Sequence, residues 1–150
     1  GIHLQNRGAG FSLHAHSQNA AASGKRPFHA IIPAFLTKND QPLMSFGVMG
    51  GPMQAQGHLQ MTLRTQLWDQ DVQMAVDAPR WRVTGNLGIA CETSFPEATL
   101  QALIEMGHNL TCEEPDNAFG FGGAQLVARL ENGAHAAGSD PRKDGQAVGF

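Results

Sequence analysis

Residues 46–58 have the sequence FGVMGGPMQAQGH, and the interpretation of the whole chain depends on this stretch. An apolar, strand-like segment runs into Gly50 and Gly51, and Pro52 then opens a segment with helical character. A glycine pair between a strand and a helix often brings the backbone close to a ligand or a reacting atom, because glycine lacks a Cβ atom. The same pattern also suits a plain tight turn. The pair therefore has two interpretations at this point.

The segments around the glycine pair predict a hairpin before it and a helix after it. Residues 28–37 and 42–49 are rich in strand formers, and residues 38–41 are typical of a turn between them. Pro52 suits the first helical position, because its missing N–H would have no partner there. Leucines recur at positions 59, 63 and 67, so one apolar helical face is predicted.

The remaining elements complete an order of strands, helices and strands. A helix over residues 96–106 is predicted to turn Leu100, Leu103 and Ile104 inward and to end at Gly107. This grouping favours an α+β fold with antiparallel pairing over a doubly wound parallel sheet. The other predicted elements are a helix at residues 72–76 and strands at residues 2–6, 80–83, 87–91, 109–112, 124–130 and 134–137.

Length and composition predict one globular domain over residues 1–150. The chain has 150 residues, of which 41% are hydrophobic, and this is enough for a core. Ten basic and thirteen acidic residues give a formal charge of -3, with no basic tract to neutralise phosphates. No apolar run approaches the roughly 20 residues that cross a bilayer. We expect neither nucleic acid nor a membrane as a partner of this segment.

The N-terminus has neither an initiator methionine nor the charged-then-apolar layout of a signal peptide. Gly1 to Gln5 already has the pattern of a strand, so we expect that the chain begins inside a larger protein. Any compartment signal would then lie upstream, and the localisation stays unknown.

Cysteine and histidine spacing gives little support for a disulfide or a metal site. Cys91 and Cys112 are the only cysteines and lack CxxC-like spacing, so they are interpreted as small core residues. Of the seven histidines, only His14 and His16 are close neighbours. A catalytic zinc site needs a third ligand. We expect no metal and no cofactor.

Two further features receive structural interpretations. The segment Asp140-Pro141-Arg142 is expected to fix a C-terminal turn through a contact between Asp140 and Arg142, since proline restricts the local geometry. Trp68 and Trp81 are expected in the core or at an interface.

Four motifs in register carry a resemblance to a known family. They are GIHLQNRGAGFSL at residues 1–13, GKRPFHAIIPAFLTKNDQPLMSFGVMGG at 24–51, DAPRW at 77–81 and GSDPRKDG at 138–145. Together they resemble the C-terminal part of the small subunit of a γ-glutamyltransferase, or glutathione hydrolase, over essentially all of the chain. The RPFH segment is similar to a divergent branch of that family.

The resemblance implies a fold, a chemistry and partners. The family belongs to the N-terminal nucleophile hydrolases, whose four-layer αββα sandwich is made by cleaving a precursor into a large and a small subunit. The nucleophile is a threonine at the new N-terminus of the small subunit, activated by its own amino group. Gly1 corresponds to a position after that threonine, so this chain alone is expected to be inactive. Its implied partners are the large subunit and the missing N-terminal part of the small subunit.

The resemblance also assigns site residues. Gly50 and Gly51 match the glycines whose backbone N–H groups bind the oxyanion formed at the acyl carbonyl. Arg7, His29 and Ala30 fall on the substrate-binding segments, where Arg7 could hold a carboxylate. The implied substrate is a γ-glutamyl compound such as glutathione. Gly10 and Ala30 depart from the family pattern, since an aspartate and a serine are expected there.

Several alternatives stay open at this stage. The chain is either part of an acyltransferase or hydrolase, a truncated inactive domain with a structural or binding role, or part of an acylase that takes another acyl group. His29 is either a pocket residue or a strand histidine facing solvent. Arg7 is either a ligand clamp or a structural ion-pair partner.

Overall fold

The computed structural model describes residues 1–2, 4–115 and 120–149. It divides into two compact units, Gly1–Ile31 and Ile32–Phe150, and each is described by itself. The single domain expected over residues 1–150 stays a prediction.

The first unit is a loop closed by its own backbone. A short 3-10 helix, η1 (Arg7–Gly10), leads to a bridge in which the Ser12 N–H donates to the Asn19 carbonyl at 2.8 Å. The strand predicted at residues 2–6 is wrong, because the described residues of that range are irregular. A strand needs a neighbour to take its backbone hydrogen bonds, and no described strand pairs with this segment.

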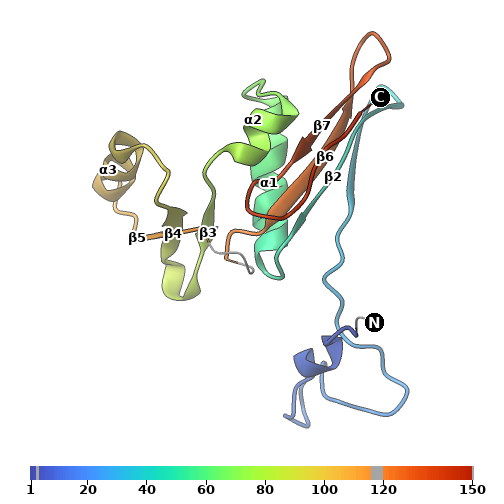
Figure 1. The fold of residues 1–150 in the computed structure, drawn as a ribbon. Coiled ribbons are helices and arrows are strands. Elements are labelled where there is room, and N and C mark those ends of the chain that lie inside the picture. The colour runs from blue at the N-terminus through green and yellow to red at the C-terminus, as the bar shows by residue number, and fades with distance from the viewer. Residues whose placement is uncertain (3, 116–119, 150) are drawn as a thin grey trace. The chain divides into compact units, whose positions relative to one another are not determined.

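The second unit contains a four-stranded antiparallel sheet in the order β1-β2-β6-β7 (Figure 1). Its strands are β1 (Ala34–Lys38), β2 (Gln41–Met49), β6 (Gly123–Arg129) and β7 (His135–Ser139). The predicted hairpin is confirmed as β1 and β2, although its first strand begins only at Ala34. Asn39 and Asp40 have φ values of 52° and 59°, the left-handed pair that a tight hairpin turn requires.

A second sheet has the order β3-β4-β5. It consists of β3 (Trp81–Val83), β4 (Ile89–Glu92) and β5 (Leu110–Glu113), and β4 pairs with β5 in parallel. The predicted antiparallel pairing is confirmed for the β1–β2, β2–β6, β6–β7 and β3–β4 pairs. Strands β4 and β5 are parallel because helix α3 (Glu97–Glu105) carries the chain back to the same end of the sheet. Cys91 and Cys112 are register partners and both are free, with Cys91 buried and Cys112 exposed.

Helices α1 (Met53–Gln66) and α2 (Val72–Asp77) pack against the four-stranded sheet (Figure 1). They cover the face that carries Met44, Phe46, Val48, Ala124 and Leu126. The predicted leucine face of α1 is wrong, since Leu59 and Leu67 are 50% and 69% exposed. The buried residues of this helix are Met53, Gln54, Gly57, Gln60 and Met61.

Two contacts fix the rotation of α1 and explain why Leu59 and Leu67 face outward. A Cβ atom on Gly57 would lie 2.5 Å from Val48 Cγ1, so glycine allows the helix to approach β2 closely. Gln60 Nε2 donates to the Trp81 carbonyl at 2.8 Å, and the Trp81 N–H donates back to Gln60 Oε1 at 3.2 Å. Helix α1 thus packs on β2 through glycine and binds the backbone of β3 through glutamine.

Helix α3 also buries less than expected. None of its residues is fully buried: Leu100 and Leu103 are half-buried, whereas Ile104 is 52% exposed, so the predicted inward face is confirmed only in part. The helix does end at Gly107, whose φ of 93° suits its C-terminus. Trp68 is 54% exposed, while Trp81 is half-buried against α1.

We expect Gly57→Ala to destabilise the protein by about 1–3 kcal/mol, because the added methyl group overpacks Val48. This outweighs the gain in helix propensity of roughly 1 kcal/mol. Urea unfolding followed by circular dichroism measures the change. Gly47→Ala is the matched control, since a Cβ atom there has no neighbour within 4 Å. Equal stability of the two variants would contradict the close contact.

Candidate functional site

The glycine pair forms the turn between β2 and α1. Strand β2 ends at Met49, and Gly50 and Gly51 have φ values of 141° and 58°. Their carbonyls accept the first bonds of the helix, from the Met53 N–H and the Gln54 N–H, both at 3.1 Å. Because both φ values are positive, a side chain at either position would be strained.

The N–H groups of the two glycines have no acceptor in the described part of the chain. Within residues 1–2, 4–115 and 120–149, neither N–H donates a hydrogen bond, whereas both carbonyls are used. Gly50 is buried and Gly51 is half-buried. The turn precedes a 14-residue helix, whose N-terminus carries partial positive charge. Two adjacent donors at that end are suited to bind an oxygen that carries negative charge.

The other predicted site residues belong to the first unit. Arg7 lies half-buried in η1, and its backbone N–H donates to Gln5 Oε1 at 2.5 Å. Among the described residues its guanidinium forms no ion pair, so the structural ion-pair interpretation finds no partner there. His29 is exposed and Ala30 is half-buried, both in an irregular segment. Of the predicted set, Gly50 and Gly51 lie side by side in one turn of the second unit.

A buried cluster of four charged side chains supports the start of β6. Arg80 and Asp140 form an ion pair in which both side chains are 0% exposed. Arg80 Nη1 also donates to the Phe121 carbonyl at 3.0 Å, and Asp140 Oδ2 accepts from the Ala124 N–H at 2.7 Å. The pair therefore holds the chain on both sides of Gly122 and Gly123.

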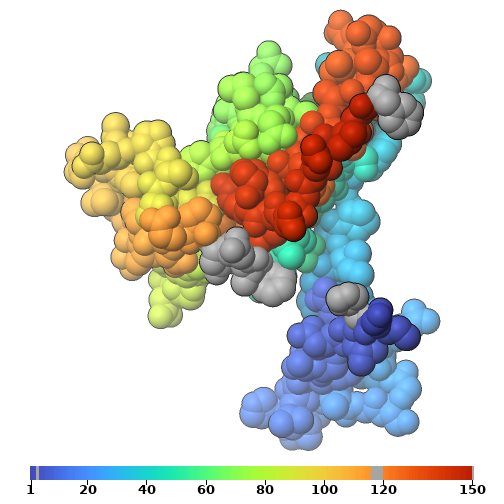
Figure 2. Space-filling view, in the orientation of Figure 1, coloured from blue at the N-terminus to red at the C-terminus, as the bar shows by residue number. Residues whose placement is uncertain are grey.

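The second half of the cluster ties the C-terminal turn to β4 and α2. Arg142 binds Glu92 through two bonds of 2.5 Å, from Nε to Oε1 and from Nη2 to Oε2. Its Nη1 donates to the Val76 carbonyl at 2.9 Å, which places the turn against α2 (Figure 2). The predicted contact within the turn is confirmed, since the Arg142 N–H donates to Asp140 Oδ1 at 2.9 Å.

Asp140 is charged despite its burial. Desolvation by itself raises the pKa of this carboxyl, but the Arg80 charge and the bonds from Ala124, Arg80 and Arg142 outweigh it. They hold the pKa below its ordinary value. Removing either Arg80 or Asp140 would leave the other charge buried without a counter-charge, and this is strongly destabilising.

Sequence reasoning missed this cluster except for the local Asp140–Arg142 contact. Arg80 and Asp140 are 60 residues apart, and Glu92 and Arg142 are 50 residues apart, so no periodic pattern connects them. The available signal was that Arg80 lies in DAPRW and that Asp140 and Arg142 lie in GSDPRKDG, two motifs that carry the family resemblance.

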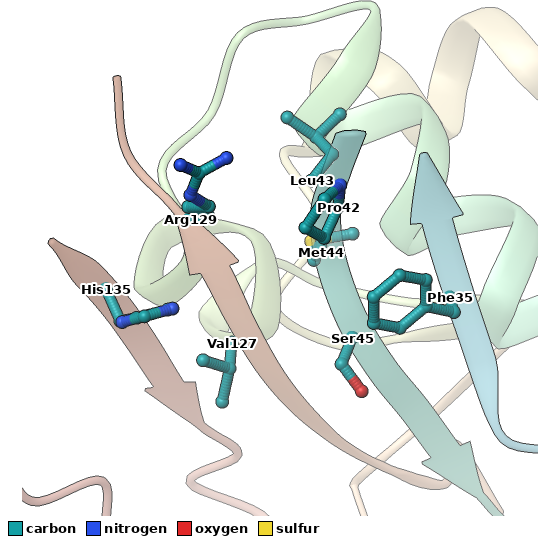
Figure 3. A pocket seen from close by; sticks show the side chains of 8 residues that line it. All are labelled: Phe35, Pro42, Leu43, Met44, Ser45, Val127, Arg129 and His135. Carbon is teal, nitrogen blue, oxygen red and sulfur yellow. The ribbon is translucent and has the colours of Figure 1, made fainter. Parts of the chain in front are cut away.

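A shallow pocket of about 170 Å³ lies on the four-stranded sheet, at the other end of β2 from the glycine turn. Phe35, Ser45 and Val127 line it from neighbouring strands (Figure 3). Strands rise about 3.4 Å per residue, so this pocket is roughly 20 Å from Gly50. It contains none of the predicted site residues and is separate from the glycine turn.

The described residues contain neither a metal-binding group nor a membrane-spanning helix. No group of three or more His, Cys, Asp or Glu side chains among them is arranged to hold a metal ion. In the same part of the chain, no helix has the length and apolar character needed to cross a membrane.

Comparison with known proteins identifies the family. A family model described as Gamma-glutamyltranspeptidase matches residues 1–150. The chain belongs to this gamma-glutamyltranspeptidase family. An oxamate amidohydrolase proenzyme of Klebsiella pneumoniae is 35% identical across the whole chain, and a glutathione hydrolase-like YwrD proenzyme of Bacillus subtilis is 34% identical. The chain spans 29% of the length of each of these relatives.

Solved structures agree with the family and with the α+β fold. A cephalosporin acylase from Bacillus halodurans is 45% identical with a TM-score of 0.89, over 100% of this chain and 28% of the acylase chain. An acivicin-inhibited gamma-glutamyltranspeptidase shares the fold at 22% identity, with a TM-score of 0.81 over 96% of this chain and 82% of its own. The gamma-glutamyltranspeptidase-family chain is thus a piece of the N-terminal nucleophile hydrolase fold, as predicted.

We expect Asp140→Asn to lower the free energy of unfolding by about 3–5 kcal/mol at pH 7, because Arg80 loses its buried counter-charge. The folded-state pKa of Asp140 lies below its unfolded value, so this stabilisation is complete above the unfolded pKa. It is lost as the pH falls through the folded pKa. Below about pH 4 the wild type should therefore lose more stability than the variant.

Urea unfolding at a series of pH values measures this difference. Asp144→Asn, at an exposed position of the same turn, is the control and should retain the wild-type pH dependence. Identical pH dependence in Asp140→Asn and the wild type would contradict a charged Asp140.

Proposed function

We propose that the protein containing this chain transfers or hydrolyses acyl groups through a threonine nucleophile that lies outside these 150 residues. In this proposal Gly50 and Gly51 supply the oxyanion hole and the chain forms part of the acyl pocket. The observation that carries it is the pair of glycine N–H groups before α1 that have no hydrogen-bond acceptor among the described residues. Membership of the gamma-glutamyltranspeptidase family supports it.

The proposed chemistry follows from where negative charge develops. Attack of a threonine hydroxyl on an acyl carbonyl converts the carbonyl oxygen into an oxyanion. Two fixed N–H donors would stabilise that oxygen more than the neutral carbonyl, and one such donor is worth about 3 kcal/mol in a water-poor site. Because Gly50 and Gly51 are set by their turn before substrate arrives, little reorganisation is needed at the moment of reaction.

The first substrate class is a γ-glutamyl compound such as glutathione, with Arg7, His29 and Ala30 in the acyl pocket. Arg7 would bind the carboxylate of the glutamyl group. The second class consists of other acyl groups, as in an acylase or an amidohydrolase. Ala30 has no hydroxyl and Gly10 has no carboxylate at positions where the family pattern has them. The likeness to a cephalosporin acylase and to an oxamate amidohydrolase also favours this second class.

The proposed partners are a large subunit and the remaining part of the small subunit. The oxamate amidohydrolase and the glutathione hydrolase-like YwrD protein named above are proenzymes, which supports assembly from a precursor. The sheet face opposite α1 and α2 carries apolar side chains, among them Phe35 at 61% and Val127 at 45% exposure. Such a face is suited to packing against further layers of a larger protein.

Two measurements separate this enzyme from an inactive binding domain. The coding sequence before Gly1 should encode a Thr-Thr-His start behind a long N-terminal region, and a start codon next to Gly1 would refute the enzyme. Chromogenic anilides and amides of glutamyl, oxamyl and larger acyl groups, offered to the full-length processed protein, identify the acyl class. The 150-residue chain alone should release nothing, and turnover by it would refute an external nucleophile.

We expect Gly51→Ala in the full-length protein to lower kcat by roughly 10- to 100-fold while KM changes little, because the oxyanion forms only after attack. A methyl group there meets no atom within 4 Å but strains a φ of 58°, so it shifts the turn. Gly107→Ala is the matched control, with a φ of 93° and open space. Equal kcat values for the two variants would argue against the oxyanion role.

A further inference from the structure

A close backbone contact constrains the peptide that precedes the glycine pair. Gly122 lies just before β6 with a φ of 75°. A Cβ atom on Gly122 would lie 2.5 Å from the Met49 carbonyl oxygen and 3.0 Å from Val48 Cγ1. Gly122 therefore has to be glycine for the chain to pass beside this carbonyl.

The contact bears on Gly50 because the Met49 carbonyl and the Gly50 N–H belong to one peptide group. That group is planar and trans, so the C=O and N–H bonds point in opposite directions and rotate together. A neighbour that limits where the Met49 oxygen lies also limits where the Gly50 N–H points. Met49 is paired with Gly123 in the sheet, so β6 holds the other side of this peptide.

The buried ion pair keeps this segment of β6 in place. Arg80 donates to the Phe121 carbonyl on one side of Gly122, and Asp140 accepts from the Ala124 N–H on the other. Because Arg80 and Asp140 also bind each other, the two anchors cannot move independently. The constraint on Met49 therefore originates in residues that do not belong to the glycine turn.

We infer that Gly122, anchored by the Arg80–Asp140 ion pair, is a positioning residue that sets the direction of the Gly50 N–H. This inference rests on the proposed oxyanion role of Gly50 and Gly51. Gly122 touches no substrate in it and acts through the Met49–Gly50 peptide.

The experiment compares Gly122→Ala with Gly133→Ala in the full-length processed protein. Both glycines have positive φ, 75° and 85°, so both substitutions strain the backbone, but a Cβ atom on Gly133 meets nothing within 4 Å. Per processed active site, we expect Gly122→Ala to lower kcat at least 10-fold with KM changed less than 3-fold, roughly the loss of a well-aimed donor. Gly133→Ala should keep the wild-type kcat.

A boronic acid analogue of the accepted acyl group gives a second readout. Its tetrahedral adduct with the nucleophile places an oxygen in the proposed hole, so its inhibition constant should rise in Gly122→Ala in proportion to the loss of kcat. Unchanged inhibition alongside reduced kcat would overturn the inference.

If Gly122→Ala does not fold, Asp140→Asn tests the ion-pair anchor without adding a heavy atom. At a temperature where circular dichroism shows a folded protein, it should lower kcat with little change in KM. A wild-type kcat in folded Asp140→Asn would overturn the inference.

Failure of the inference and of the proposed function can be distinguished. A wild-type protein that turns over none of the acyl substrates overturns the proposed function. A wild-type protein that is active and sensitive to Gly51→Ala, but in which Gly122→Ala behaves like Gly133→Ala, overturns the positioning role of Gly122 alone.

Discussion

The buried ion pair between Arg80 and Asp140 is the interaction on which the rest of the second unit depends. Each partner is fully buried, so each needs the other's charge as well as its backbone bonds. These bonds reach the Val76 carbonyl at the end of α2, Phe121 before β6 and Ala124 within it. One pair of side chains therefore connects helix, sheet and C-terminal turn.

Arg142 and Glu92 extend this arrangement to the second sheet. Glu92 ends β4, and besides Arg142 it accepts a bond of 2.8 Å from the Arg80 N–H. The cluster thus alternates in sign from Glu92 through Arg142 and Asp140 to Arg80. Buried ion pairs are not in general more stabilising than apolar packing. Their hydrogen bonds are directional, however, so they fix the relative positions of the segments that they join. In this fold the fixed geometry is the approach of β6 to the end of β2.

The parts of the fold that depend only on residues close in the chain could be predicted from the sequence. The turn at Asn39 and Asp40, the glycine pair and the C-terminal glycine of α3 all follow from conformations that few residues tolerate. The leucine face of α1 failed because the helix is rotated by tertiary contacts at Gly57 and Gln60. For the same reason the charged cluster escaped prediction apart from its local Asp140–Arg142 contact, since its other members are brought together only by the completed fold.

The use of backbone donors has a consequence for how this family diverges. Every residue except proline carries an N–H, so substitution within the turn seldom deletes a donor; it changes the donor's direction. On the proposed roles, a relative could keep both glycines and still lose activity by changing Gly122 or an anchor of β6. Inheritance of the Gly-Gly sequence is then a weak criterion for an active family member, and the residues facing the Met49 carbonyl are a more informative one.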